Sequence, residues 1–224
     1  MKTSTKKSNA RRLGNMFNLL GHIYNPLKRV FLANQPEKVI NQAVASMDFY
    51  SSVLVIGGGA DNTLIELLAQ NKCDNITHID ISSVQTQKGK DKLQSENKEW
   101  FKKVAFKTIP FLDFHTNLKF EAIVCPFYLD LFTEWEVREN IEKIKTHLSK
   151  DGLVYVIDFS SRASTSKQNI LLIKILYSLF YPITGVYRTK VPNYKDLFKE
   201  KGFELFAEQV LYNGRFQVLA FKIA

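Results

Sequence analysis

The feature that most constrains the fold is a short apolar run that ends in three consecutive glycines. Residues 53–56 are β-branched or leucine, which is typical of a buried strand, and Gly57, Gly58 and Gly59 follow directly. Residues 62–70 then carry apolar side chains at helical spacing. Glycine tolerates positive φ and lets a backbone approach a ligand, and a helix N-terminus offers unpaired amides. The segment therefore predicts a strand, a tight ligand-binding turn and a helix.

An acidic residue stands near the end of the next predicted strand, at residues 76–81. Asp80 lies 23 positions after Gly57, which is about the spacing at which an acid accepts hydrogen bonds from ribose hydroxyls in nucleotide-binding folds. One βαβ unit thus supplies both a glycine turn and a candidate ribose acid. The alternative is that Asp80 only caps the turn that follows it.

Strands and helices alternate through the middle of the chain. Further strands are predicted at 104–109, 122–125 and 153–159, and helices at 36–47, 84–96 and about 134–148. Thr133 and Glu136 fit a capping box at the start of the last helix, and Asp151-Gly152 predicts a turn before the fifth strand. This alternation predicts a doubly wound α/β fold, with a mostly parallel sheet and helices on both faces.

The C-terminus breaks this rhythm. A helix at 194–201, capped by Asn193 and ended by Gly202, precedes strand-like segments at 203–211 and 215–223 on either side of Asn213-Gly214. These segments predict an antiparallel hairpin. The hairpin disfavours a nicotinamide oxidoreductase, which would share the glycine turn and the ribose acid.

Four segments together resemble the class I S-adenosylmethionine-dependent methyltransferases of the small-molecule type, nearest the quinone-biosynthesis group. Residues 53–63 look like the motif V-L-D-x-G-x-G-x-G, and 77–82 like the acid motif of the second strand. Residues 120–125 are similar to the fourth-strand pattern F-D-x-V-x-C/S, and 148–153 to the L-K-P-G-G-x turn. The resemblance covers roughly residues 40–224.

This resemblance implies a seven-stranded, Rossmann-like methyltransferase sheet with a C-terminal antiparallel hairpin, and S-adenosyl-L-methionine as the cofactor. The residues that it assigns to cofactor binding are Gly57, Gly58, Gly59, Asp80, Ile81 and Cys125. It implies methyl transfer to a small, hydrophobic or aromatic acceptor. The alternatives are a tRNA or rRNA methyltransferase and a non-catalytic binding protein that kept the fold.

Three positions depart from the family pattern. Val55 stands where the family has an acid that orients the amino-acid end of the cofactor, and Asp61 stands where the third glycine is expected. Pro110 replaces an aspartate that contacts adenine, and nearby Asp113 is a substitute if the loop register shifts. These departures motivate the non-catalytic alternative.

No catalytic residue is assigned, because methyl transfer from a sulfonium depends mostly on alignment of the reacting atoms. A base, where one exists, is expected within residues 125–130 or near His22 and Tyr24. The sequence Cys125-Pro-Phe-Tyr128 weakly resembles the N/D-P-P-Y signature of amine methyltransferases, since cysteine replaces the amide or carboxylate poorly.

Residues 160–191 occupy the position of a substrate lid. Apolar and aromatic side chains at helical spacing within 170–181 would line an acceptor pocket, or else belong to ordinary core packing.

The net charge of +9 is concentrated at the N-terminus, because residues 1–36 hold seven Lys and Arg and no acid. We expect a basic flexible tail at 1–12 and one methyltransferase domain at 13–224, with lead-in helices at 13–48. The tail is either solvated or makes weak contact with RNA or an anionic membrane surface. A mitochondrial-type presequence is a further alternative.

The two cysteines, Cys73 and Cys125, and the four histidines have no metal-ligand spacing, so we expect no metal. The absence of a disulfide framework favours a cytoplasmic location. The most apolar stretch, 170–183, is interrupted and too short to span a bilayer.

Overall fold

The computed structural model describes residues 34–160, 178 and 191–224. The predicted tail, the lead-in segment before residue 34 and most of the predicted lid lie outside the described residues. The helices are α2 (Gln35–Ala45), α3 (Thr63–Ala69), α4 (Ser83–Glu96), α5 (Lys98–Lys102), α6 (Glu134–His147) and α8 (Tyr194–Glu200), with short 3₁₀ turns η1 (Phe111–Asp113) and η2 (Leu129–Leu131). The strands are β1 (Tyr50–Ile56), β2 (Cys73–Asp80), β3 (Val104–Thr108), β4 (Phe120–Pro126), β5 (Leu148–Phe159), β6 (Phe203–Leu211) and β7 (Phe216–Ile223).

The strands form one seven-stranded sheet in the order β3-β2-β1-β4-β5-β7-β6. The first five strands are parallel, and β7 is inserted antiparallel between β5 and β6. Tyr212, Asn213 and Gly214 adopt positive φ in the turn that joins β6 to β7. The predicted sheet and its C-terminal hairpin are therefore confirmed.

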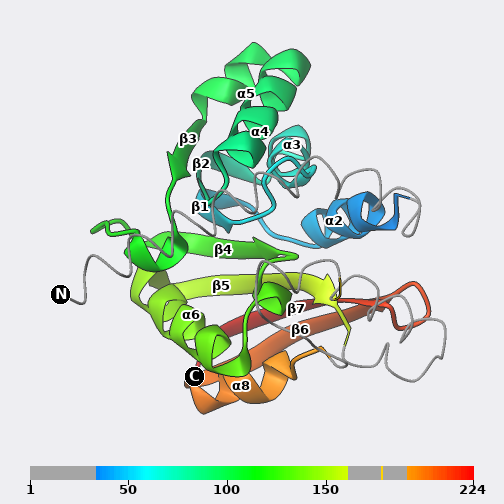
Figure 1. Ribbon diagram of the computed structural model, residues 1–224, viewed down its shortest axis with the longest axis vertical. Coiled ribbons are helices and arrows are strands. Elements are labelled where there is room, and N and C mark those ends of the chain that lie inside the picture. Colours follow the sequence, from blue (N-terminus) through cyan, green and yellow to red (C-terminus); the bar gives the residue numbers. More distant parts are fainter. Residues whose placement is uncertain (1–33, 161–177, 179–190) are drawn as a thin grey trace.

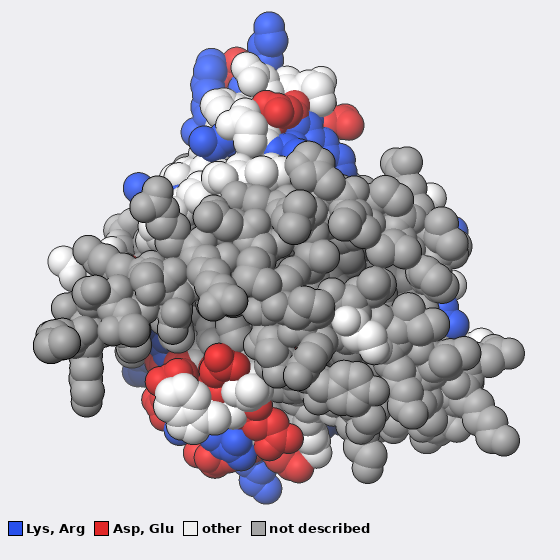
Figure 2. All heavy atoms as spheres, in the orientation of Figure 1, with Lys and Arg blue, Asp and Glu red and all other residues white. Residues whose placement is uncertain are grey.

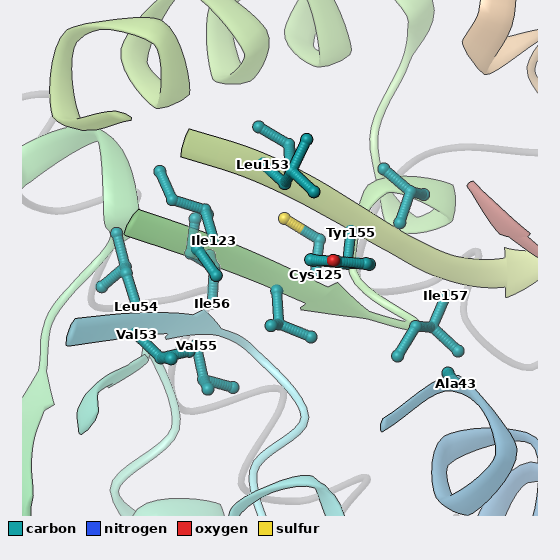
Figure 3. Packing of buried hydrophobic residues seen from close by; sticks show 14 of the residues in the cluster. Ala43, Val53, Leu54, Val55, Ile56, Ile123, Cys125, Leu153, Tyr155 and Ile157 are labelled. Carbon is teal, nitrogen blue, oxygen red and sulfur yellow. The ribbon is translucent and has the colours of Figure 1, made fainter. Parts of the chain in front are cut away.

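Helices cover this sheet in two groups. Figure 1 shows α3, α4 and α5 beside the half of the sheet that contains β1, β2 and β3, and α6 and α8 beside β4–β7. Helix α2 contacts α3 and β5, where Ala43 lies near Ile157 (Figure 3). The central strands are buried on both faces: Val53 and Val55 point to one side of β1, and Leu54 and Ile56 point to the other (Figure 3). These near-continuous apolar runs are what a parallel sheet covered on both faces requires.

Two local predictions need correction. No turn precedes the fifth strand: β5 already begins at Leu148, and its register against β4 shifts, so that Phe120 pairs with Leu148 and Ala122 with Leu153. Between these two pairs β5 has more residues than β4, and one of them is Gly152, where a Cβ would lie 2.9 Å from the Glu121 carbonyl oxygen. At α8, Asn193 makes no side-chain cap hydrogen bond; its amide instead donates to Asp196 (2.5 Å).

Candidate cofactor and acceptor site

The strand order places the candidate site at the carboxyl ends of β1 and β4. β1 and β4 are adjacent and parallel. After β1 the chain adds β2 and β3 on one side of this pair, and after β4 it adds β5 on the other side. Ligands of open α/β sheets bind at such a reversal. Gly57 follows β1 and Tyr128 follows β4, and a Cβ on Gly57 would lie only 2.9 Å from the Tyr128 ring.

The glycine loop has a backbone that only glycine adopts easily. Gly57, Gly58 and Gly59 have φ values of +76°, +77° and +42°. A Cβ on Gly58 would lie 2.7 Å from both the Asp61 carboxylate and Pro126, so the loop is tight as well as left-handed.

The His78 side chain on β2 contacts the glycine loop. The ring is buried, and its Nε2 lies 3.1 Å from the Gly57 carbonyl oxygen. Burial lowers the pKa of His78 to about 4, so the ring is neutral at physiological pH. Nε2 therefore carries the proton and donates to Gly57, which fixes the carbonyl at the strand end. The sequence pattern did not predict this contact.

Asp80 lies against the same loop. Its Oδ1 accepts the Ser82 amide at 2.7 Å, so it does cap the turn, while a Cβ on Gly59 would lie 3.2 Å from its Oδ2. Burial, and secondarily the charge of Asp61, raise the pKa of Asp80 to about 6, although backbone amides oppose the shift. Half-buried Ile81 follows it. The structure thus brings Gly57, Gly58, Gly59 and Asp80 together.

These residues fit a cofactor that contains a nucleoside. Asp80 places a carboxylate at the end of β2, where ribose hydroxyls would find an acceptor, and the three glycines add no side chains of their own to the tight loop beside it. Beside the loop, the Thr63 hydroxyl is fully buried and has no hydrogen-bond partner among the described residues. A buried polar atom of this kind is normally satisfied by water or a ligand.

Cys125 has a different environment. It is wholly buried in β4, and its side chain lies within the core beside Leu153 and Tyr155 (Figure 3). Burial raises the pKa of its thiol well above the usual range, so the thiol stays protonated. The Cys125 side chain is therefore part of the core, and its assignment to cofactor binding stays a prediction.

Tyr128 is engaged within the protein. Its hydroxyl donates to Asn140 Oδ1 on α6 at 2.8 Å, and burial holds its pKa well above the ordinary value. The neighbouring Phe127 has a φ of +47°, which is unusual for a bulky residue and typical of functional loops. Phe127 packs edge-on against Phe159 and Phe216, with ring centroids 5.8 and 6.0 Å away.

A buried acid pair lies at the ends of β5 and η2, and sequence reasoning missed it. Asp158 accepts the Asp130 amide at 3.2 Å, the Tyr194 hydroxyl at 2.8 Å and the Phe159 amide at 2.7 Å. Burial and the charge of Asp130 raise the pKa of Asp158 well above its usual range. The available signal was an acid at the end of an apolar strand, the same pattern that singled out Asp80.

The other predicted residues lie elsewhere. Val55 is 1% exposed and belongs to the core. Asp113 is exposed on η1, whose Phe111 packs on His147 at the C-terminal end of α6, near the start of β5 and away from the glycine loop. His22 and Tyr24 lie outside the described residues.

Within the described ranges, no group of three or more His, Cys, Asp or Glu is arranged to hold a metal ion. None of the helices in those ranges is long and apolar enough to cross a membrane.

Comparisons with known proteins agree with this geometry. The family described as "Methyltransferase domain" matches residues 16–208. No curated protein matches the chain. Among solved structures, the mitomycin 7-O-methyltransferase MmcR superposes with a TM-score of 0.68 at 15% identity, over 92% of this chain and 60% of that one. A methyltransferase from Clostridium acetobutylicum ATCC 824 gives 0.65 at 11% identity, over 93% and 99%. The glycopeptide N-methyltransferase MtfA gives 0.64 at 11% identity, over 84% and 94%.

This chain spans less than two thirds of the length of MmcR, but nearly all of the other two. The family match covers most of the sequence, and the TM-scores of 0.64–0.68 show that the chain shares the fold of these structures. The chain therefore belongs to the methyltransferase-domain family and has the fold of the class I S-adenosylmethionine-dependent enzymes.

Proposed function

We propose that this protein transfers the methyl group of S-adenosylmethionine to a small acceptor with a hydrophobic or aromatic part. The observation that carries the proposal is the left-handed glycine loop at the carboxyl end of β1, which lies against Asp80 on one side and against the Tyr128 ring on the other. Gly57, Gly58, Gly59, Asp80, Ile81 and the backbone of Cys125 would hold the cofactor. MmcR and MtfA are named as O- and N-methyltransferases, and the latter is complexed with S-adenosylmethionine.

The cofactor supplies an electrophilic methyl group on a good leaving group, so the protein has mainly to bind and align. Phe127, Phe159 and Phe216 pack on one another near the carboxyl ends of β4 and β5, and an apolar cluster at this end of the sheet favours a hydrophobic acceptor. Asp130 is the acid in the segment where a base is expected. Tyr128 is not the base, because its hydroxyl donates to Asn140.

Calorimetric titration with S-adenosylmethionine and S-adenosylhomocysteine tests the cofactor assignment. Binding of both ligands supports the proposal, whereas the absence of heat with either ligand contradicts it and favours a non-catalytic binding protein. Mass-spectrometric detection of a methylated product among small aromatic acceptors then tests the reaction.

A second candidate is a tRNA or rRNA methyltransferase. It is favoured by the segment from α4 to β3 (residues 83–108), which holds seven lysines and three acids. Figure 2 shows blue side chains gathered over this part of the molecule. Basic surfaces of this kind bind phosphates with a strong dependence on salt.

Removing residues 1–12 separates the two candidates. Loss of salt-dependent RNA affinity would support an RNA substrate. Unchanged turnover of a small apolar acceptor would exclude a role for the tail.

A further inference from the structure

A glycine in the middle of α4 lies against the glycine loop. Gly89 is buried on the face of the helix that also buries Thr86 and Leu93. Glycine is unfavourable in a helix interior, because it loses the most backbone freedom on folding. Gly89 is not among the glycines with positive φ, so the backbone conformation of α4 does not require a glycine there.

Lack of space is what requires a glycine at this position. A Cβ on Gly89 would lie 2.7 Å from the Gly59 carbonyl oxygen and 3.7 Å from the Gly59 carbonyl carbon. In the described part of the chain, these are the only atoms outside α4 that such a Cβ would meet within 4 Å. A separation of 2.7 Å is well inside van der Waals contact. Helix α4 therefore packs backbone against backbone on the third glycine of the loop.

Gly59 is enclosed by α4 on one side and by Asp80 on the other. A Cβ on Gly59 would lie 2.6 Å from Gln85 Cβ and 3.2 Å from Asp80 Oδ2. Gln85 is one helical turn before Gly89, so both residues lie on the same face of α4. Burial raises the pKa of Asp80 to about 6, and a hydrogen bond from the Gly59 backbone opposes that shift. The position of Gly59 therefore acts directly on the Asp80 carboxylate.

A side chain at position 89 would displace either the loop or the helix. If the loop yields, the Gly59 carbonyl moves and the Gly59 backbone moves with it. If the helix yields, the turn that joins Asp80 to α4 moves, because α4 begins at Ser83. Either displacement changes the contact between Gly59 and Asp80.

From this geometry we propose that Gly89 is a positioning residue for the cofactor. By leaving α4 without a side chain at this point, it sets the position of Gly59 and, through Gly59, that of the carboxylate that would bind the ribose. The inference rests on the proposed function. The competing explanation is that Gly89 serves only tight packing, in which case a substitution lowers stability and leaves the cofactor site unchanged.

Gly89→Ala adds the single carbon that separates these explanations. Gly152→Ala is the matched control, because its Cβ would lie 2.9 Å from the Glu121 carbonyl oxygen, near the amino ends of β4 and β5. Gln94→Ala, at an exposed position of α4, controls for an added helix-favouring residue. Calorimetry with S-adenosylhomocysteine gives the Kd of each variant between pH 5 and pH 8, and urea unfolding gives its stability.

We expect Gly89→Ala to weaken S-adenosylhomocysteine by about tenfold or more, because misplacement of a binding group by less than about an ångström is enough for such a loss. Both controls should change the Kd by less than about twofold, although Gly152→Ala lowers stability. In the unmodified protein, binding should weaken below about pH 6, as Asp80 takes up a proton. This pH should rise in Gly89→Ala, because Asp80 loses its hydrogen bond from Gly59.

Hydrogen exchange of the unmodified protein tests the same contact without a substitution, and it decides the matter if Gly89→Ala does not fold. S-adenosylhomocysteine should slow amide exchange in residues 86–93 more than in α8. Equal slowing in the two helices, or no slowing in residues 86–93, overturns the proposal.

An unchanged Kd and pH profile in folded Gly89→Ala, or an equal loss of affinity in Gly152→Ala, also overturns the role of Gly89 and leaves the proposed function standing. Failure of the unmodified protein to bind S-adenosylhomocysteine overturns the proposed function, and this inference with it.

Discussion

At the residue scale, Asp80 carries a stability cost that a ligand would offset. Its pKa is raised to about 6 in the folded protein, against about 3.9 when unfolded, so the folded state holds the proton more tightly. The free energy of unfolding therefore falls as pH rises from about 4.5 to about 7.5, by about 2 kcal/mol from this group. Asp80→Asn should remove that part of the pH dependence. Urea unfolding at both pH values measures it, and an unchanged slope would contradict the assignment.

Which residues lie together at the glycine loop was predictable where chemistry and spacing coincide, and their role in cofactor binding stays a prediction. Gly57, Gly58, Gly59 and Asp80 follow from a strand, a turn and a second strand. Two other features were not predictable: the hydrogen bond from His78 to Gly57 and the Asp130–Asp158 pair. Each joins residues whose proximity depends on the sheet register or on how the loops close after the strands. A sequence pattern does not contain that information.

At the element scale, α6 begins with the predicted capping box. The Thr133 hydroxyl accepts the Glu136 amide at 3.3 Å, and Glu136 accepts the Thr133 amide at 2.8 Å. Thr133→Ala should lower the free energy of unfolding by about 1 kcal/mol, because it leaves a helix amide without its partner. Thr146→Ala, at an exposed position near the other end of α6, is the control. Equal losses in the two variants, measured by urea denaturation, would argue against the cap.

The ends of helices and strands were predictable where a short sequence motif determines them. The capping box, and the Asn213-Gly214 turn between β6 and β7, were confirmed. The start of β5 was predicted wrongly, since Asp151-Gly152 has the composition of a turn. In the structure, Gly152 instead lets the chain pass close to the Glu121 carbonyl within an irregular ladder. Pairing with β4, rather than local propensity, decides that boundary.

At the scale of the whole molecule, ligand binding and unfolding are linked. A ligand that binds only the folded protein stabilises it by about 2.7 kcal/mol at a hundred times its Kd. For a chain of this size, that corresponds to a rise in Tm of roughly 5–10 °C. Saturating S-adenosylhomocysteine should produce this rise in thermal unfolding, and Asp80→Asn should reduce it. An unchanged Tm at saturation would speak against binding at the loop.

Substitutions at the amino ends and at the carboxyl ends of the parallel strands should affect stability and ligand binding differently. The candidate groups lie at the carboxyl ends of the strands, whereas Tyr50 is the first residue of β1, and its hydroxyl meets that of Tyr155 at 2.6 Å in the core. Tyr50→Phe leaves a buried hydroxyl without this partner, which costs about 1–2 kcal/mol of stability. Because the loop is at the other end of β1, the Kd for S-adenosylhomocysteine should stay the same. Urea unfolding and calorimetry on one preparation measure both quantities, and a weakened Kd in the folded variant would show that the two ends are coupled.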